Sequence, residues 1–165
     1  MEAAHRVVHR SGSEGAVFEV GGDMITFKGS REDGVGSLFL ELVSPPGGGP
    51  PPHTDPSEEL FYVLDGEFEF TLSGPAGLAS VRASRGDSVV VPKRAVHTYH
   101  NAGKANGRLL VFFREGERMQ GFFEELGDPV SDPVHWTSSG PPPRERVIAA
   151  CRHHGVEFAG PAPKT

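Results

Sequence analysis

The chain has 165 residues, a formal net charge of −6 and a hydrophobic fraction of 36%, and it contains 22 Gly, 15 Pro and one Cys. This length predicts a single domain that can bury a core, and the many turn-forming residues favour short strands over long helices, so we expect an all-β fold. The acidic balance argues against a nucleic-acid partner, and the lone Cys151 leaves no internal disulfide. We find neither a secretory signal nor an apolar segment long enough for a bilayer, so we expect a cytoplasmic protein without a membrane partner.

The first third of the chain predicts a polar arm followed by three strands. Residues 1–15 are polar and contain Gly and Ser, which favours a flexible N-terminal arm. Residues 16–20 and 24–27 are short apolar runs around a Gly-Gly-Asp turn, which predicts a hairpin. Residues 37–43 form a nearly continuous apolar strand, in which Glu41 is interpreted as a pocket residue or an edge residue.

A stiff connector and a series of short strands follow. Residues 44–52 are rich in Pro and Gly and supply few backbone donors, so they are expected to deliver His53 rather than to form sheet. The runs 59–64 and 67–72 flank the turn dipeptide Asp65-Gly66, which predicts a hairpin. Further strands are predicted over residues 78–83, 88–91, 95–101 and 108–113.

The C-terminal part changes to a helical period. Apolar residues recur at helical spacing between Glu115 and Gly127, which predicts a short helix that ends at this glycine. Residues 128–143 read as a linker, and residues 144–154 predict a second short helix. We therefore expect an arm (1–15), a β-domain with a trailing helix (16–127), and a C-terminal linker and short helix (128–165), with both helices packed on the outside of the β-domain.

Two polar motifs stand out against this background. The first reads Gly47-x5-His53-x-Asp55-x3-Glu59-x6-Gly66, and the second reads Gly86-x5-Pro92-x-Arg94-x2-His97-x3-Asn101. Residues 53 and 55 lie on the same face of an extended segment, while Glu59 begins the next strand. His97 and Tyr99 share one face of their predicted strand. An imidazole and two carboxylates at this spacing are typical of a metal site or an acid/base site.

Together the two motifs resemble the signatures of the cupin family, G-x5-H-x-H-x3 or 4-E-x6-G and G-x5-P-x-G-x2-H-x3-N. Every signature position is filled except two, because Asp55 stands where the family has its second His and Arg94 where it has Gly. The resemblance covers residues 35–114 directly, and the flanks are similar to single-domain bacterial quercetin 2,3-dioxygenase-like cupins. It implies a double-stranded β-helix, a jelly-roll barrel with one or two short C-terminal helices, that forms a homodimer through exchanged edge strands.

The resemblance also implies a ligand set for a divalent transition metal. His53, Asp55, Glu59 and His97 match the metal-ligand positions, and mixed nitrogen and oxygen ligands suit Fe, Ni, Co, Mn or Zn. Asp55 leaves three alternatives open: it is a ligand, it lies outside the ligand shell as a general base, or it marks the loss of metal binding. Phe70 and Tyr99, together with Glu41, are predicted to line the cavity.

The leading functional hypothesis is an O2-dependent dioxygenase that acts on a small aromatic or polyketide-like substrate, with Glu59 or Asp55 moving a proton. One alternative is a non-redox isomerase or cyclase, or a metal-free ligand-binding cupin, that uses Asp55, Glu59 and the histidines as acid/base groups. Another is an Fe(II)/2-oxoglutarate-type oxygenase that uses His53, Asp55 and His97 as its triad, with Arg108 as the co-substrate arginine.

Overall fold

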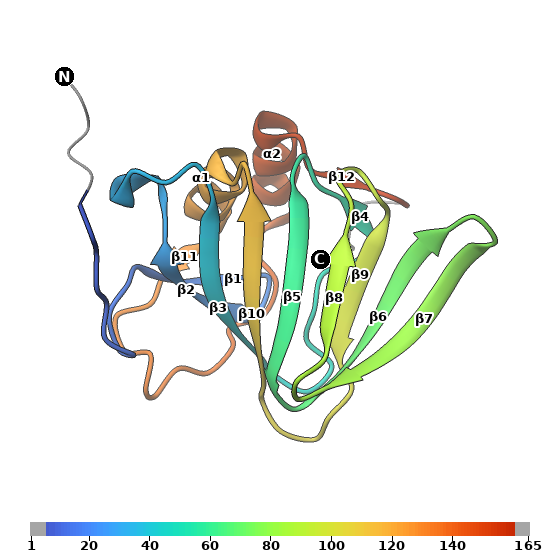
Figure 1. Ribbon diagram of the computed structural model, residues 1–165, viewed down its shortest axis with the longest axis horizontal. Coiled ribbons are helices and arrows are strands. Elements are labelled where there is room, and N and C mark those ends of the chain that lie inside the picture. The colour runs from blue at the N-terminus through green and yellow to red at the C-terminus, as the bar shows by residue number, and fades with distance from the viewer. Residues whose placement is uncertain (1–5, 161–165) are drawn as a thin grey trace.

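Alternating apolar side chains along short strands produce two antiparallel sheets that face each other, as the computed structural model shows for residues 6–160 (Figure 1). In spatial order, the seven-stranded sheet contains β11 (Asp128–Pro129), β1 (Val17–Val20), β2 (Asp23–Gly29), β3 (Leu38–Ser44), β10 (Gly107–Arg114), β5 (Glu58–Asp65) and β8 (Ser88–Val91). The five-stranded sheet contains β12 (Glu157–Phe158), β4 (His53–Thr54), β9 (His97–Asn101), β6 (Glu67–Gly74) and β7 (Gly77–Ser84). The helices are a 3-10 turn (Arg31–Asp33), α1 (Glu117–Leu126) and α2 (Arg144–His154).

The core between the sheets is built on aromatic side chains from both of them. Phe68 and Phe70 alternate along β6 and are fully buried, and Tyr99 of β9 lies directly opposite Phe70. Phe61 of the other sheet packs edge-on against Phe70 and Tyr99, with ring centroids 5.2 and 5.7 Å apart. Such pairs contribute roughly 0.5–1.5 kcal/mol beyond the burial of their area. These contacts fix the separation of the two sheets next to the polar motifs.

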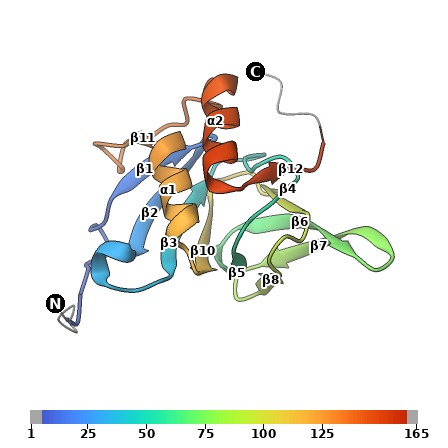
Figure 2. The ribbon, with the colours of Figure 1, turned by 90° about the horizontal axis from the view of Figure 1, so that it is seen from above.

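We expected α1 and α2 on the outside of the β-domain, but they cover the inner side of the larger sheet. There α1 packs on α2, β1 and β3 (Figure 2). Met119, Phe122 and Leu126 are buried there and belong to the main core. The helical period correctly identified the apolar face of α1, but it carries no information about which face of a sheet this side covers.

The Pro/Gly connector makes more backbone hydrogen bonds than its composition predicted. Gly47 N donates to the Asn101 carbonyl, and Asn101 N donates to the Gly48 carbonyl, both at 2.9 Å, so the connector runs alongside β9. The Asn101 side chain donates to the Ser44 carbonyl at 2.8 Å and accepts from Gly103 N at 2.9 Å. The last residue of the second motif therefore joins the connector to the turn after β9.

Both terminal segments of the described chain are anchored on the barrel. Within the predicted N-terminal arm, residues 1–5 lie outside the described residues, and Arg10 forms a two-point ion pair with Asp33 at 2.7 and 2.8 Å. The buried carboxylate of Glu19 accepts hydrogen bonds from Trp136 Nε1 and from Ser139, which holds the linker against β1.

Among residues 6–160, no helix combines the length and the apolar character needed to cross a membrane.

Gly49 is the point of closest approach between the connector and β9. Its φ is 142°, and a Cβ at this position would overlap the carbonyl oxygen of Tyr99. We predict that Gly49→Ala lowers the free energy of unfolding by about 2–3 kcal/mol, because a backbone atom cannot move aside without displacing the strand. Chemical denaturation measures the effect.

Gly34→Ala is the matched control. Gly34 also has a positive φ, 78°, but a Cβ there meets no atom within 4 Å, so only the backbone cost of about 1 kcal/mol applies. Equal losses of stability in the two variants would contradict the close-packing argument.

Candidate metal centre

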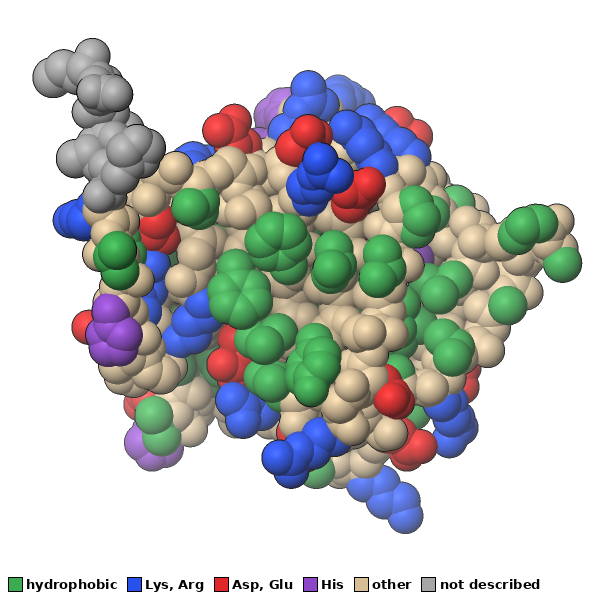
Figure 3. Space-filling model, in the orientation of Figure 1, with side chains coloured by type: hydrophobic (Ala, Val, Ile, Leu, Met, Phe, Trp, Pro, Cys, Tyr) green, Lys and Arg blue, Asp and Glu red, His purple; other side chains and the backbone are tan. Residues whose placement is uncertain are grey.

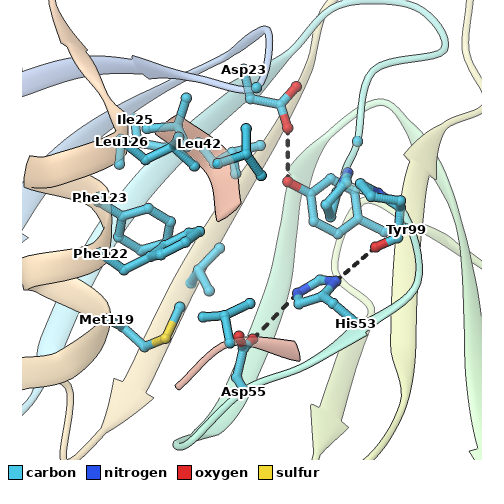
Figure 4. A pocket seen from close by; sticks show the side chains of 18 of the residues that line it. Asp23, Ile25, Leu42, His53, Asp55, Tyr99, Met119, Phe122, Phe123 and Leu126 are labelled. Atoms are coloured by element: carbon cyan, nitrogen blue, oxygen red, sulfur yellow. Dashed lines mark hydrogen bonds and ion pairs between the residues drawn. The ribbon is translucent and has the colours of Figure 1, made fainter. Parts of the chain in front are cut away.

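Strand pairing brings the two motif histidines together. β4 pairs with β9 so that His53 lies directly opposite His97, and their ring centroids are 4.4 Å apart. Asp55 follows β4 and points to the same side, and Glu59 lies on the facing strand β5 (Figure 4 shows His53 and Asp55). Asp55, Glu59 and His97 are 2–3% exposed, and His53 is 9% exposed. His53, Asp55 and His97 therefore meet at one buried point, and Glu59 lies beside His97.

The backbone fixes which nitrogen each imidazole offers. His53 Nδ1 lies 2.8 Å from the Pro51 carbonyl oxygen, and His97 Nδ1 lies 3.1 Å from that of Ala95. A carbonyl oxygen only accepts, so each Nδ1 carries the proton. Each Nε2 then presents a lone pair to the cluster. This is the arrangement in which an outer hydrogen bond sets the tautomer of a metal-binding histidine.

The ligand atoms are spaced as a metal ion requires. The offered atoms of His53, Asp55 and His97 all lie within 4.8 Å of one another. The Asp55 Oδ2 atom is 3.4 Å from His53 Nε2 and 3.7 Å from His97 Nε2. Ligands about 2.0–2.2 Å from a common centre lie roughly 3–3.6 Å apart, so the first separation falls within this range and the second lies just above it.

Buried oxygen atoms without hydrogen bonds support the fit of a cation. Neither carboxylate oxygen of Asp55 has a hydrogen-bond partner, and Glu59 Oε2 has none. Glu59 Oε2 approaches His97 Nε2 to 2.7 Å without hydrogen-bond geometry, as expected for two atoms aimed at a shared third point. A buried acceptor with no donor is costly, and a metal ion at this point would satisfy these atoms together. The residues present therefore fit a divalent metal, with His53, Asp55 and His97 as the core of its ligand set.

The two carboxyl groups of the cluster have different environments. Burial, together with the charge of Asp55, raises the pKa of Glu59 well above its ordinary value. Burial also acts to raise the pKa of Asp55, but the nearby imidazoles of His53 and His97 favour its ionised form and outweigh burial, so that this pKa lies below its ordinary value. Burial lowers the pKa of His53, but the neighbouring Asp55 raises it by more, so this pKa lies above its ordinary value. In the metal-free cluster the proton therefore resides on Glu59 and the negative charge on Asp55.

The cluster lies at one end of a mostly apolar cavity of about 240 Å³. Both sheets and both helices form its wall, and the close-up shows the part contributed by α1 (Figure 4). Tyr99 lines the cavity as predicted. The apolar lining includes Ile25, Leu40, Leu42, Phe61, Val111, Phe113, Met119, Phe122, Phe123 and Leu126.

Two other predicted pocket residues lie elsewhere. Phe70 is fully buried, but it is surrounded by Phe61, Phe68 and Tyr99 in the core and does not border the cavity. Glu41 is on the outer face of β3, a central strand, and pairs there with Arg108 at 2.7 Å. This pairing also places Arg108 outside the cavity, so it cannot act as a co-substrate arginine for the His-Asp-His triad.

Arg94 occupies the position where the second cupin signature has Gly, and its backbone conformation suits that residue. Its φ is 65°, a left-handed conformation that Gly adopts without cost, and its N–H donates to the Asp55 carbonyl at 3.0 Å. The Arg94 guanidinium also donates to the Gly155 carbonyl at 2.9 Å. The side chain thus ties the turn that supports Asp55 to the end of α2.

Sequence reasoning missed Asp23, which also borders the cavity. Its carboxylate accepts a hydrogen bond from Ser44 Oγ at 2.6 Å and from the Tyr99 hydroxyl at 2.8 Å. Burial raises the pKa of Asp23 to about 6 against these two hydrogen bonds. Asp23 follows two glycines and reads as a turn residue, so only the observed start of β2 reveals its inward position.

Comparison with known proteins agrees with the fold. A family model described as the cupin domain matches residues 40–113. No curated protein matches the chain. A predicted oxalate decarboxylase from Thermotoga maritima has a TM-score of 0.56 and 21% identity, with 66% of this chain and 98% of that chain covered.

Two further solved structures show the same likeness. An RmlC-like cupin from Shewanella frigidimarina has a TM-score of 0.54 and 21% identity over 66% of this chain and 92% of that chain. An oxalate oxidase has a TM-score of 0.51 and 24% identity over 80% of this chain and 66% of that chain. The chain has the cupin β-barrel fold, and the matched domain supports its placement in the cupin family.

The ligand assignment predicts the effect of removing one imidazole. We expect His97→Ala to weaken the binding of Mn(II), Co(II) or Ni(II) by at least about tenfold, because one of the three nearest ligands is lost. We also expect Asp55→Asn to weaken it, since an ionised ligand becomes neutral. Metal analysis after dialysis against each ion measures the retained stoichiometry.

His100→Ala is the matched control for the metal measurement. His100 lies on the same strand as His97, but its side chain is exposed on the other face. It should retain the metal content of the unaltered protein. Full metal content in His97→Ala would contradict the assignment, and full content in Asp55→Asn would remove Asp55 from the ligand set.

Proposed function

We propose that the protein is a metal-dependent cupin dioxygenase that adds both atoms of O2 to a small, mainly apolar substrate with an aromatic or polyketide-like enol. The observation that carries this proposal is the position of a two-imidazole, one-carboxylate cluster at one end of a mostly apolar cavity. The related structures named as oxalate decarboxylase and oxalate oxidase support catalysis on this fold. Because fold does not determine substrate, the cavity wall is the better guide to the ligand.

The apolar wall favours an aromatic substrate over a small dianion such as oxalate. Ile25, Leu42, Phe61 and Phe122 offer dispersion contacts but no hydrogen bonds to a ring or chain of carbon atoms. A dicarboxylate would leave its second carboxylate against these side chains, where an unpaired charge is costly. A substrate with one oxygen-bearing end and an apolar body matches the cavity.

Each group in the cluster has a distinct role in this proposal. A metal held by His53, Asp55 and His97 would supply Lewis-acid and redox chemistry. Glu59 lies beside His97, where a cation held by the cluster would favour its ionised form. In that form it is placed to accept the proton of a substrate hydroxyl and to return it to the product. Incorporation of both oxygen atoms keeps the electrons in balance, so the reaction requires no separate reductant. The apolar side chains of the wall limit access of water to the reacting end.

A non-redox acid–base reaction is the second candidate, because the cavity also contains the carboxyl group of Asp23. An isomerase or cyclase could use Asp55, Glu59 and Asp23 without oxygen. The two candidates differ in their requirement for O2. The metal-free ligand-binding alternative predicts no turnover of any kind.

Oxygen uptake separates these candidates. We predict that protein loaded with Fe(II), Ni(II), Co(II) or Mn(II) consumes O2 with flavonol as the probe substrate and does not do so with oxalate. Glu59→Gln should reduce turnover by about 10²–10³-fold with metal content unchanged, because the amide cannot accept the substrate proton. An oxygen electrode and metal analysis measure both quantities.

The control variant is Glu58→Gln, which alters the neighbouring half-buried carboxylate that pairs with Arg114 on the outer face of the sheet. It should leave oxygen uptake unchanged. No uptake with flavonol under any of the four metals, or uptake with oxalate alone, would overturn the proposal.

A further inference from the structure

The carboxylate of Asp23 lies at the end of the cavity opposite the metal cluster. Figure 4 shows Asp23 at one end of the lined space and Asp55 at the other, with apolar side chains from β2, β3 and α1 between them. Asp23 is 4% exposed, and it borders the cavity together with Tyr99. The cavity therefore has two polar ends and an apolar middle.

The hydrogen bonds of Asp23 leave acceptor capacity unused. Ser44 Oγ donates to one carboxylate oxygen and the Tyr99 hydroxyl donates to the other. Both partners are neutral, and within residues 6–160 no Lys, Arg or His forms an ion pair with Asp23. An ionised carboxylate has about four acceptor sites, so two donors satisfy only half of them. A buried carboxylate is normally paired with a charge, and this one is not.

The position of Asp23 is fixed by close packing behind it. A Cβ at Gly48 would lie 2.9 Å from the Asp23 carboxylate and would also crowd Ser44. The connector thus closes one side of the carboxylate, and the side that remains open is the cavity. Because the Tyr99 hydroxyl donates its proton to Asp23, its own oxygen can accept a second donor. Two acceptors consequently lie side by side at this end of the cavity.

We propose that Asp23 and Tyr99 form a recognition subsite for a hydrogen-bond donor, a hydroxyl or an ammonium group, on a ligand whose apolar body fills the cavity and whose other end reaches the His53–Asp55–His97 cluster. This inference rests on the proposed function only in taking the cavity as the substrate site. It narrows the substrate class to aromatic or polyketide-like compounds with polar groups at both ends.

Binding of naphthol to metal-free protein tests the subsite without requiring catalysis. The probes are naphthol, its methyl ether, which lacks the donor, and protonated naphthylmethylamine. We expect naphthol or the amine to bind at least about tenfold more tightly than the ether, because a donor to a buried carboxylate is a strong hydrogen bond. The preferred probe identifies the donor as hydroxyl or ammonium. Calorimetric titration provides the affinities.

Variants distinguish the subsite from general hydrophobic binding. Asp23→Asn and Tyr99→Phe should each reduce the preference over the ether to less than about threefold. Ser44→Ala is the control, because Ser44 contacts Asp23 but does not line the cavity, and it should retain the preference. Equal binding of naphthol, amine and ether, a full preference in Asp23→Asn, or no binding of any probe would overturn the subsite. None of these results bears on oxygen uptake, so the two proposals fail separately.

A second, independent observation concerns the outer face of the seven-stranded sheet. Phe39, Phe112, Leu60 and Val90 form a cross-strand row over β3, β10, β5 and β8, and each is 36–62% exposed. Tyr62 lies two residues along from Leu60 on the same face and is 46% exposed. We term these five residues the outer row, and the space-filling view shows apolar side chains gathered on this side of the molecule (Figure 3). A monomer rarely exposes such a surface.

Charges at both ends of the outer row indicate what covers it. Glu58 pairs with Arg114 at one end at 3.2 Å, and Glu41 pairs with Arg108 at the other at 2.7 Å. When a second copy stacks on this face about a two-fold axis, each end of one outer row lies against an end of the other. Both ends contain one Arg and one Glu, so each Arg can face a Glu of the other copy whichever ends meet. We infer that the outer row is the face of a homodimer in which two sheets stack. The homodimer expected from the resemblance would then form through sheet faces rather than through exchanged edge strands.

Sedimentation equilibrium at about 10–100 μM tests this face. We expect the mass of two 17.6 kDa chains for the unaltered protein and a monomer for Leu60→Glu. Leu78→Glu is the matched control, because Leu78 is 65% exposed on β7, outside this face, and it should remain a dimer. Thermal unfolding confirms that each variant is folded. A monomeric unaltered protein, or a dimer of Leu60→Glu, would overturn the inference.

Discussion

The pairing of β4 with β9 is the constraint on which the rest of the site depends. It places His53 opposite His97, and the backbone carbonyls of Pro51 and Ala95 then hold each imidazole with Nε2 directed to one point. β4 is only two residues long, so its position is set by the connector that runs beside β9 and by the edge strand β12. The connector needs glycine at position 49 because the Tyr99 backbone lies against it. The Pro/Gly composition of this segment therefore serves the geometry of the metal centre.

Three buried carboxyl groups, those of Asp23, Asp55 and Glu59, border one mostly apolar cavity. Asp55 is compensated by two imidazoles, Glu59 has its pKa raised by burial, and Asp23 has only hydroxyl partners. Burial of this kind lowers stability unless each group has a partner. In the proposed complex a metal ion would satisfy Asp55 together with the histidines, and a ligand donor would satisfy Asp23. The cavity would then hold the two polar ends of one molecule, with aromatic and aliphatic side chains between them.

The fold and the candidate metal cluster could be predicted from the sequence because two motifs of fixed spacing lie on strands that the cupin barrel pairs. The turn at Asp65-Gly66 and the alternation of Phe68 and Phe70 were readable for the same local reason. Glu41 was not readable, because the outward residue Phe39 of the same strand is also apolar and hides the period of two. Phe70 points inward as predicted, yet the rings around it separate it from the cavity.

Asp23 and the inner position of α1 depend on contacts between distant segments. Asp23 acquires its role from Ser44 and Tyr99, which are 21 and 76 residues away in the chain. The Asp55 substitution within the first motif left the ligand question open. The distances between Asp55, His53 and His97 favour the ligand alternative, because Asp55 oxygens without hydrogen bonds lie 3.4 and 3.7 Å from the two Nε2 atoms.

The most direct test of this account is a crystal structure of protein grown with Mn(II) or Co(II), with diffraction recorded at the absorption edge of the metal. If His53, Asp55 and His97 hold the metal, one anomalous peak will lie about 2.0–2.2 Å from His53 Nε2, His97 Nε2 and a carboxylate oxygen of Asp55. A peak that lies away from these three residues, or no peak in protein saturated with the metal, would contradict it.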